Sequence, residues 1–325
     1  MIHADTRREA LSRWLAAQLR AARFSLEPAS EDASFRRYWR ARLDDGRTFV
    51  VMDAPPDKED CRPFVRVAAL LRAAGVHAPE VFAQDLDLGF LLLADLGTTT
   101  YLEALSADNA ARLFADATDA LVRWQLATRP GELPPYDEPL LRREMNLFPE
   151  WYVARHLGIE LSESQNSALE DVFRLLVTSA LAQAGVYVHR DYMPRNLIVC
   201  KPNPGVLDFQ DAVLGPITYD MVSLLRDAFV SWDEERVLDW SVRYWEKAKR
   251  AALPVEADFA EFWRAFEWMG LQRHLKVLGI FARIRYRDGK PKYLEDTPRF
   301  IGYARAVAAR YGELAPLARL LDEIE

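Results

Sequence analysis

The sequence contains little cysteine and no long apolar run. Only two of its 325 residues are cysteines, Cys61 and Cys200, and they are far apart without the spacing of metal ligands. This indicates a reducing compartment rather than a disulfide framework. No stretch of about 18 apolar residues occurs, and residues 1–20 lack the apolar core of a signal peptide. We therefore expect no membrane span and no membrane partner, and we expect a cytoplasmic protein.

The chain also lacks an excess of positive charge. Its 49 acidic and 42 basic residues give a formal net charge of −7, which argues against a surface that binds nucleic acid. Half of the residues are hydrophobic and 28% are charged, as in an ordinary globular enzyme. The length is sufficient for one large domain or for two lobes. Nothing in the sequence indicates an oligomeric state.

The hydrophobic patterns predict a small sheet followed by a large helical region. A first helix is expected to end at about Ala22, and residues 24–94 read as an antiparallel sheet with a hairpin turn at Asp45-Gly46 and one inserted helix at 58–74. Beyond the segment 93–97 the helical period dominates. Helices are expected at 102–127, 140–156 and 164–184 and from 219 onward, with short strands at 187–188, 197–199 and 206–207.

The most informative motif lies between the last predicted strands. It reads HRDxxxxN from His189 to Asn196 and is followed, after an apolar run, by Asp208-Phe209. This spacing is typical of a phosphotransferase active site. Asp191 could accept a proton from a substrate hydroxyl, and Asn196 and Asp208 offer the oxygen ligands that Mg²⁺ prefers. Each residue alone could simply cap a turn, but their shared context favours the catalytic interpretation.

Two neighbours of the motif are interpreted as structural. His189 is expected to hold the loop by hydrogen bonds, and Asp220 to cap the helix that begins at Met221 and to steady the catalytic loop. The order of lobes and the motif together predict an α+β, protein-kinase-like two-lobed fold. We expect residues 1–96 to form a nucleotide-binding lobe, with an N-terminal helix, an antiparallel sheet and one helix, and residues 97–325 to form a mostly helical catalytic lobe.

These residues resemble the aminoglycoside phosphotransferase/choline kinase superfamily. The run LDFQDAVLGPITYD, residues 207–220, is similar to that superfamily's Asp-Phe/Trp segment followed by Gly-Pro and Tyr-Asp. Runs such as DASFRRYWR, FEWMGLQRHLKVLGIFAR and RDGKPKYLEDTPR look like a narrower family, the anomeric N-acetylmuramate/N-acetylglucosamine kinases of bacterial cell-wall recycling. That resemblance covers nearly the whole chain.

The resemblance implies transfer of the γ-phosphate of ATP to the C1 hydroxyl of N-acetylmuramic acid or N-acetylglucosamine. The product would be an α-1-phosphate for peptidoglycan recycling, made in a sugar-binding C-terminal lobe. Two alternatives stay open. One is a kinase of another small alcohol, such as an aminoglycoside or choline. The other is a nucleotide-binding pseudokinase, because two features of the nucleotide region are missing.

The missing features are a GxGxxG loop and a strand lysine. The counterpart of the loop is residues 30–35, where backbone N–H groups could hold phosphate. Met52 or Asp53 stands where the lysine is expected, so Arg36, Arg37 or Arg40 would have to supply the cation, although all three could equally be surface residues. The segment 93–97 would present its backbone to adenine. The expected nucleotide contacts are Ser34, Phe35, Arg37, Val51, Leu93, Ala94, Asp95 and Leu96.

For the sugar, polar side chains suit the hydroxyl groups and tryptophan suits the face of a pyranose ring. Arg195, within the motif, could bind the lactyl carboxylate of muramic acid. Trp268 and Arg273 lie on a predicted helix whose periodicity is equally typical of simple packing. The expected sugar contacts are Glu144, Arg195, Gln210, Asp211, Trp268 and Arg273.

Overall fold

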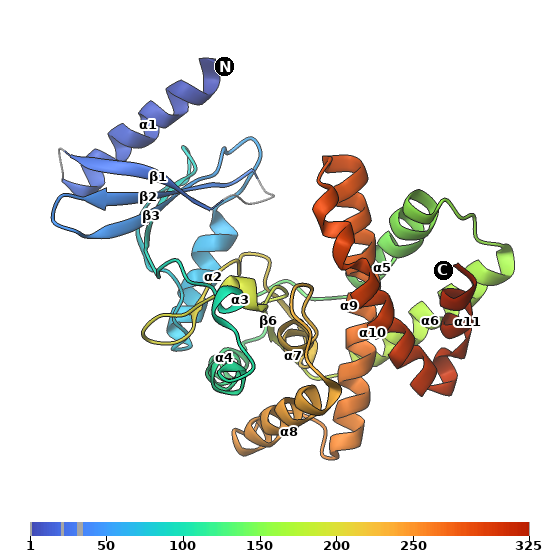
Figure 1. Cartoon of the computed structure of the whole chain (residues 1–325). Helices are drawn as coiled ribbons and strands as arrows, with labels where there is room; N and C mark the ends of the chain where they lie inside the picture. The colour runs from blue at the N-terminus through green and yellow to red at the C-terminus, as the bar shows by residue number, and fades with distance from the viewer. Residues whose placement is uncertain (1, 21–22, 31–34, 325) are drawn as a thin grey trace. The chain divides into compact units, whose positions relative to one another are not determined.

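The computed structural model describes residues 2–20, 23–30 and 35–324 (Figure 1). Its elements confirm the predicted α+β class, with a five-stranded sheet first and a mostly helical region after it. The chain divides into two compact units. Unit 1 comprises Met1–Ala104 and Arg195–Asp211, and unit 2 comprises Leu105–Pro194 and Ala212–Glu325.

The sheet of unit 1 is antiparallel. Its strands, in the spatial order β1-β2-β3-β5-β4, are β1 (Phe24–Ser30), β2 (Arg37–Leu43), β3 (Thr48–Asp53), β5 (Phe90–Ala94) and β4 (Val81–Asp85). The predicted hairpin joins β2 to β3, and Gly46 adopts the left-handed φ of +87° that glycine tolerates in such a turn. Because successive side chains point to opposite faces, the register determines which residues share a face. Arg40, Val50 and Leu93 are paired across three strands and lie on one face.

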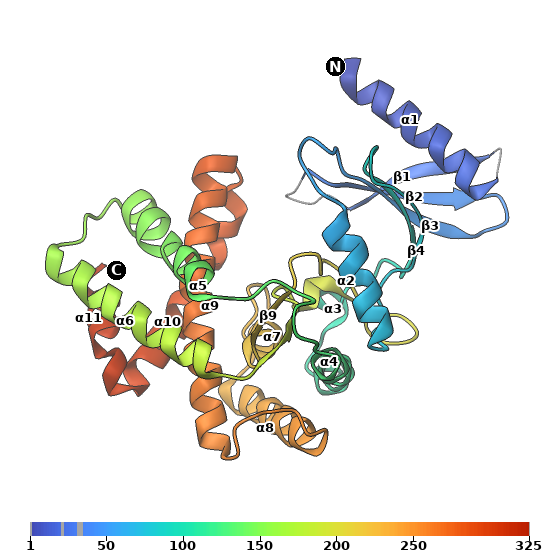
Figure 2. The ribbon, with the colours of Figure 1, turned by 180° about the vertical axis from the view of Figure 1, so that it is seen from behind.

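Helix α1 (Ile2–Leu19) covers the other face. Leu11 and Leu15 form a buried cluster with Val51 and Leu92 of the sheet. Figures 1 and 2 show α1 above the sheet and α2 (Arg62–Ala73) below it. Two helix boundaries differ from the prediction, because α1 ends at Leu19 and residues 58–61 precede α2 instead of forming its first turn.

The segment 195–211 belongs to unit 1 although its neighbours in the sequence do not. It contains η2 (Pro194–Asn196), which begins one residue earlier, and the short strands β7 (Leu197–Ile198) and β8 (Gly205–Val206). The N–H of Val206 donates to the carbonyl of His77 at 2.8 Å, and the rings of Phe209 and Phe64 lie 4.7 Å apart. The segment therefore shares hydrogen bonds and apolar contacts with the first hundred residues, including α3 (Tyr101–Ala104).

Unit 2 is organised around the long helix α9 (Phe259–Asp288). Its other elements are α4 (Ala110–Leu126), α5 (Glu138–Met145), η1 (Phe148–Leu157), α6 (Glu163–Ala182), β6 (Gly185–Val188), β9 (Val213–Pro216), α7 (Tyr219–Leu225), α8 (Glu234–Arg250), η3 (Pro291–Asp296), α10 (Thr297–Arg310), η4 (Gly312–Leu314) and α11 (Ala315–Ile324). Helix α9 contacts α5, η1, α6, α7, α8, η3 and α10. At Gly279 it approaches the backbone of Leu147 so closely that an added Cβ would lie 2.3 Å from the carbonyl carbon.

Three further elements differ from the prediction. The helix expected at 102–127 is two helices, α3 and α4, separated by residues 105–109. The helix expected at 140–156 changes at Asn146–Leu147 into the π-helix η1, and strand β9 was not predicted.

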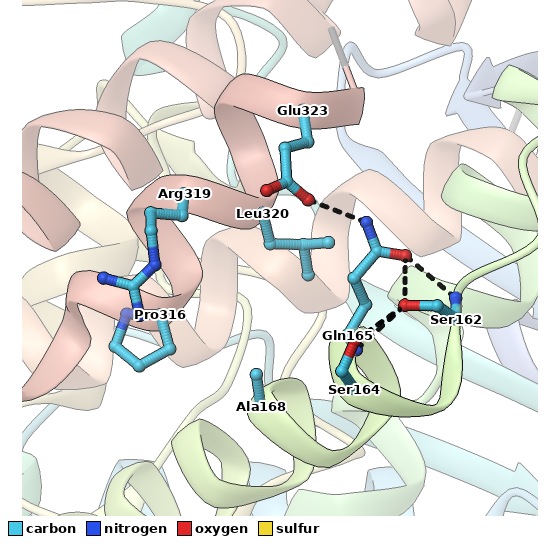
Figure 3. A pocket seen from close by; sticks show the side chains of 8 residues that line it. All are labelled: Ser162, Ser164, Gln165, Ala168, Pro316, Arg319, Leu320 and Glu323. Atoms are coloured by element: carbon cyan, nitrogen blue, oxygen red, sulfur yellow. Dashed lines mark hydrogen bonds between the residues drawn. The ribbon is translucent and has the colours of Figure 1, made fainter.

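Figure 3 shows the start of α6, where Ser162 and Gln165 form a capping box beside a hollow of about 320 Å³. The side-chain amide of Gln165 also donates to Glu323 of α11 at 2.7 Å. None of the helices in the part of the chain that the structure describes combines the length and the apolarity needed to cross a membrane.

Candidate active site

A cavity of about 270 Å³ lies within unit 1 on the face of the sheet opposite α1. Strand residues line one part of it, namely Ala29, Tyr38, Arg40, Val50 and Leu93. The segment after β5 and the segment 195–211 line the rest, with Ala94, Asp95, Leu96, Gly97, Arg195, Asn196, Ile198, Leu207 and Asp208. The structure thus places apolar side chains, the backbone of residues 94–97 and two candidate metal ligands around one cavity.

The expected nucleotide residues fall into two groups. Leu93, Ala94, Asp95 and Leu96 line the cavity. Val51 instead lies in the cluster under α1, and its neighbour Val50 lines the cavity, because adjacent residues of β3 face opposite ways. Phe35 is 64% exposed, and Ser34 lies outside the described residues.

The segment after β5 is held by an ion pair. Arg40 donates from Nε and Nη2 to the two oxygens of Asp95, at 2.7 and 3.0 Å, and the N–H of Gly97 donates to the same carboxylate at 3.1 Å. Burial acts to raise the pKa of Asp95, but the hydrogen bonds from Arg40 and Gly97 lower it below its ordinary value. The bidentate geometry fixes the direction of the backbone that follows Leu93.

The carboxylate of Asp53 lies on the α1 face. It is 1% exposed and accepts hydrogen bonds from Arg37 and Arg7, each at 2.6 Å. Met52 lies on the cavity face, paired with Tyr38 across the strands. Of Met52 and Asp53, the two residues expected at the lysine position, Met52 therefore faces the cavity side. Arg37, one of the candidate cations, is engaged with Asp53 on the other side of the sheet.

Asn196 and Asp208 meet at the edge of the cavity. The amide of Asn196 donates to Asp208 Oδ2 at 3.4 Å, and that of Gln210 donates to Oδ1 at 3.0 Å. Asp208 adopts a left-handed φ of +63°, a conformation uncommon outside glycine and often found at functional sites. Gln210 Oε1 is buried and has no hydrogen-bond partner among the described residues. This set of hard oxygen donors fits Mg²⁺.

The loop that carries Asp191 lies in unit 2, between β6 and the segment 195–211. The buried carboxylate of Asp220 accepts hydrogen bonds from the N–H groups of His189, at 2.7 Å, and Arg190, at 3.0 Å. The N–H of Asp191 lies 3.3 Å from His189 Nδ1. The structural roles predicted for His189 and Asp220 are thus confirmed, except that Asp220 does not cap α7, whose N-cap residue is Thr218.

The side chain of Arg190 leads into a buried polar cluster. Glu144 of α5 accepts from Arg190 at 2.5 Å and from Lys276 of α9 at 2.9 Å, and the hydroxyl of Tyr136 donates to it. Burial alone would raise the pKa of Glu144, but Lys276, Arg190 and Tyr136 lower it to about 2. The hydroxyl of Tyr219 also accepts from Lys276, at 3.0 Å. Arg190, with a left-handed φ of +76°, is therefore held from both its backbone and its guanidinium.

Sequence reasoning missed Lys276, Tyr136 and Tyr219 in this cluster. The available signal was a lysine directly before the apolar run 277–282 of a predicted helix. Lys276 is only 8% exposed, and a buried lysine requires an anionic or hydrogen-bonding partner.

The expected sugar residues are divided between the units. Arg195, Gln210 and Asp211 belong to unit 1, where Arg195 lines the cavity. Glu144, Trp268 and Arg273 belong to unit 2 and are all largely buried. Trp268 packs edge-on against Tyr311, with the guanidinium of Arg264 at 4.5 Å from its ring. The sugar role of all six residues stays a prediction.

The family model described as "Phosphotransferase enzyme family" matches residues 25–259, well over half of the chain. The chain therefore belongs to the phosphotransferase enzyme family, and it is a phosphotransferase.

Two relatives and one solved structure sharpen this assignment. The chain is 57% identical to the N-acetylmuramate/N-acetylglucosamine kinase of Pseudomonas putida over 93% of this chain and 88% of that protein. It is 52% identical to the kinase of the same name from Neisseria meningitidis serogroup B, over 97% and 95%. A choline/ethanolamine kinase family protein of Mesorhizobium loti shares the fold, with a TM-score of 0.63, 13% identity and 99% of both chains covered. The kinase-like fold predicted from the sequence is thus confirmed.

Proposed function

We propose that this protein transfers the γ-phosphate of ATP to the anomeric C1 hydroxyl of N-acetylmuramic acid and N-acetylglucosamine, and that the resulting α-1-phosphate is used in peptidoglycan recycling. The proposed acceptor is supported by two N-acetylmuramate/N-acetylglucosamine kinases that are 57% and 52% identical to this protein over more than nine tenths of its chain. The cavity of unit 1 supports the proposal that ATP is the phosphate donor, because it combines an apolar slot with oxygen donors for a metal ion.

Each residue has a defined task in this proposal. Val50 and Leu93 enclose adenine, while the backbone of residues 94–96 offers it hydrogen-bonding groups. Asn196 and Asp208 hold Mg²⁺, which neutralises charge on the phosphates when bound. Asp191 accepts the proton of the attacking hydroxyl and orients it toward the γ-phosphorus.

The hydrogen bonds around Asp191 support its assignment. His189 and Arg190, the two residues before Asp191, donate their N–H groups to Asp220, which leaves the loop little freedom to reorient. A general base must be positioned before its pKa matters, so a fixed loop is the first requirement.

The proposal also includes a lobe boundary between residues 96 and 97 and a cytoplasmic location.

The test offers ATP with N-acetylglucosamine, N-acetylmuramate, choline or kanamycin and measures ADP. We expect ADP with both amino sugars, and phosphorus–proton coupling to the anomeric proton in the purified product. ADP release with only choline or kanamycin would contradict the proposed acceptor. Coupling to a proton other than the anomeric one would move the phosphate to a different hydroxyl.

A further inference from the structure

Arg36 lies directly before β2 (Arg37–Leu43), and in the extended chain the side chains of adjacent residues such as Arg36 and Arg37 point to opposite faces. Arg37 pairs with Asp53 on the α1 face, whereas Tyr38 and Arg40 line the cavity. Even-numbered positions at this end of the strand therefore belong to the cavity face. The position of Arg36 keeps this parity, and the acidic side chains whose charge acts on its guanidinium are Glu59, Asp208 and Asp211.

The surroundings of Arg36 are acidic and mostly buried. Its side chain is 12% exposed, and its Nε lies 4.0 Å from Glu59 Oε2. Burial acts to lower the pKa of Arg36, but Tyr38, Glu59, Asp208 and Asp211 together raise it above its ordinary value. The guanidinium therefore stays charged, and the carboxylate that we assign to the metal is among the charges that act on it.

Glu59 is suited to position Arg36. Its N–H donates to the carbonyl of Pro55 at 2.9 Å, so its backbone is fixed in the turn that follows β3. A guanidinium carries five N–H donors in a rigid fork, more than one carboxylate can accept. Arg36 can thus keep its contact with Glu59 and still donate to a phosphate oxygen.

We propose that Arg36 is the cation that contacts the phosphates of the nucleoside triphosphate in unit 1, in place of a lysine on β3, and that Glu59 is its positioning residue. The inference rests on the proposed use of ATP. Met52, which faces the cavity side of β3, carries no charge that could do this, and Arg40 is already paired with Asp95. Of the three arginines expected to replace the lysine, Arg36 is the one on which the charge of Asp208 acts.

The test separates phosphate contacts from all others. Adenosine, ADP and ATP are titrated into the whole protein by calorimetry with Mg²⁺ and without sugar. Arg36→Ala is expected to weaken ATP binding about 10- to 100-fold while adenosine binding stays within about twofold, because a hydrogen bond to a charged group is lost. Arg36→Lys is expected to recover part of the loss, and it serves as the test variant if Arg36→Ala does not fold.

Two further variants complete the comparison. Arg42→Ala removes an arginine of β2 whose ion pair with Glu27, at 3.4 Å, is solvent-exposed, and all three affinities are expected to stay at the wild-type level. Glu59→Gln is expected to weaken ATP binding less than Arg36→Ala and to add nothing in that background, as a residue acting through Arg36 should.

The proposal is overturned if Arg36→Ala binds ATP like the wild type, if it loses adenosine and ATP affinity equally, or if the ATP-specific loss appears in Arg37→Ala instead. Wild-type protein that does not bind ATP would overturn both this inference and the proposed function. Intact ATP binding with no phosphorylation of either amino sugar would overturn the proposed acceptor alone.

Discussion

The buried carboxylate of Glu144 gives a prediction whose size follows from the structure. Its side chain is 7% exposed and is shared by Arg190 and Lys276. Glu144→Gln would leave both cations buried without their anion, and breaking a buried pair in this way costs about 3–5 kcal/mol. The pKa gives a similar figure, because a fall from 4.5 to about 2 corresponds to on the order of 3 kcal/mol of stability.

The sign of the pH dependence is also determined. Since the pKa of Glu144 is lower in the folded than in the unfolded chain, its stabilising contribution is complete above about pH 4.5 and is lost as the pH falls toward 2. Urea unfolding of the wild type and Glu144→Gln at pH 7 and at lower pH measures this. The free energy of unfolding should differ by about 3 kcal/mol at pH 7, and the difference should shrink in acid.

A neighbouring acid provides the control. Glu138 lies on the same helix and pairs with Arg142, but its side chain is 52% exposed, so Glu138→Gln should change the free energy of unfolding by less than about 1 kcal/mol. A Glu144→Gln protein within 1 kcal/mol of the wild type at pH 7 would refute the reasoning. So would a difference that stays constant as the pH falls.

Three other changes have defined outcomes. Asp191→Asn should leave ATP affinity within about twofold and lower kcat by about 10²- to 10⁴-fold in steady-state assays, and unchanged turnover would remove Asp191 as the base. Gly279→Ala should lower the free energy of unfolding by about 1–3 kcal/mol, because the added Cβ would overlap the backbone of Leu147. Gly302→Ala, where nothing lies within 4 Å, should instead raise the melting temperature, and equal effects would contradict this account. Asp53→Asn should lower the urea midpoint, because its two arginine partners lose their carboxylate, and a midpoint equal to the wild type would show that the pairs contribute nothing.

Local features of the fold could be predicted from the sequence. Gly46 marks the hairpin because it tolerates a left-handed φ, and the basic, aromatic run of β2 and the apolar, β-branched run of β3 mark the strands around it. The spacing of Asp191, Asn196 and Asp208 identified the class of enzyme because phosphoryl transfer needs a base and oxygen ligands. These signals depend on residues that are near one another in the chain.

Features that depend on distant residues could not be predicted. Val50 and Val51 are equally apolar, and only the packing of α1 decides which of them faces the cavity. Glu144 was predicted to contact the sugar. Its buried ion pair could not be foreseen, because its partner Lys276 lies on a helix far along the chain. The π-helix η1, which packs on α9, was likewise hidden, since its residues keep an ordinary helical pattern.

The segment 195–211 has a consequence for dissecting the protein. Neither unit is encoded by one continuous stretch, because the chain leaves unit 2 at residue 194 and returns to it at residue 212. A gene fragment that stops at residue 104 would lack β7, β8, Asn196 and Asp208, and with them part of the wall of the cavity. A shuffled gene that exchanges only the first hundred codons between two such kinases would therefore combine the nucleotide slot of one parent with the metal ligands of the other.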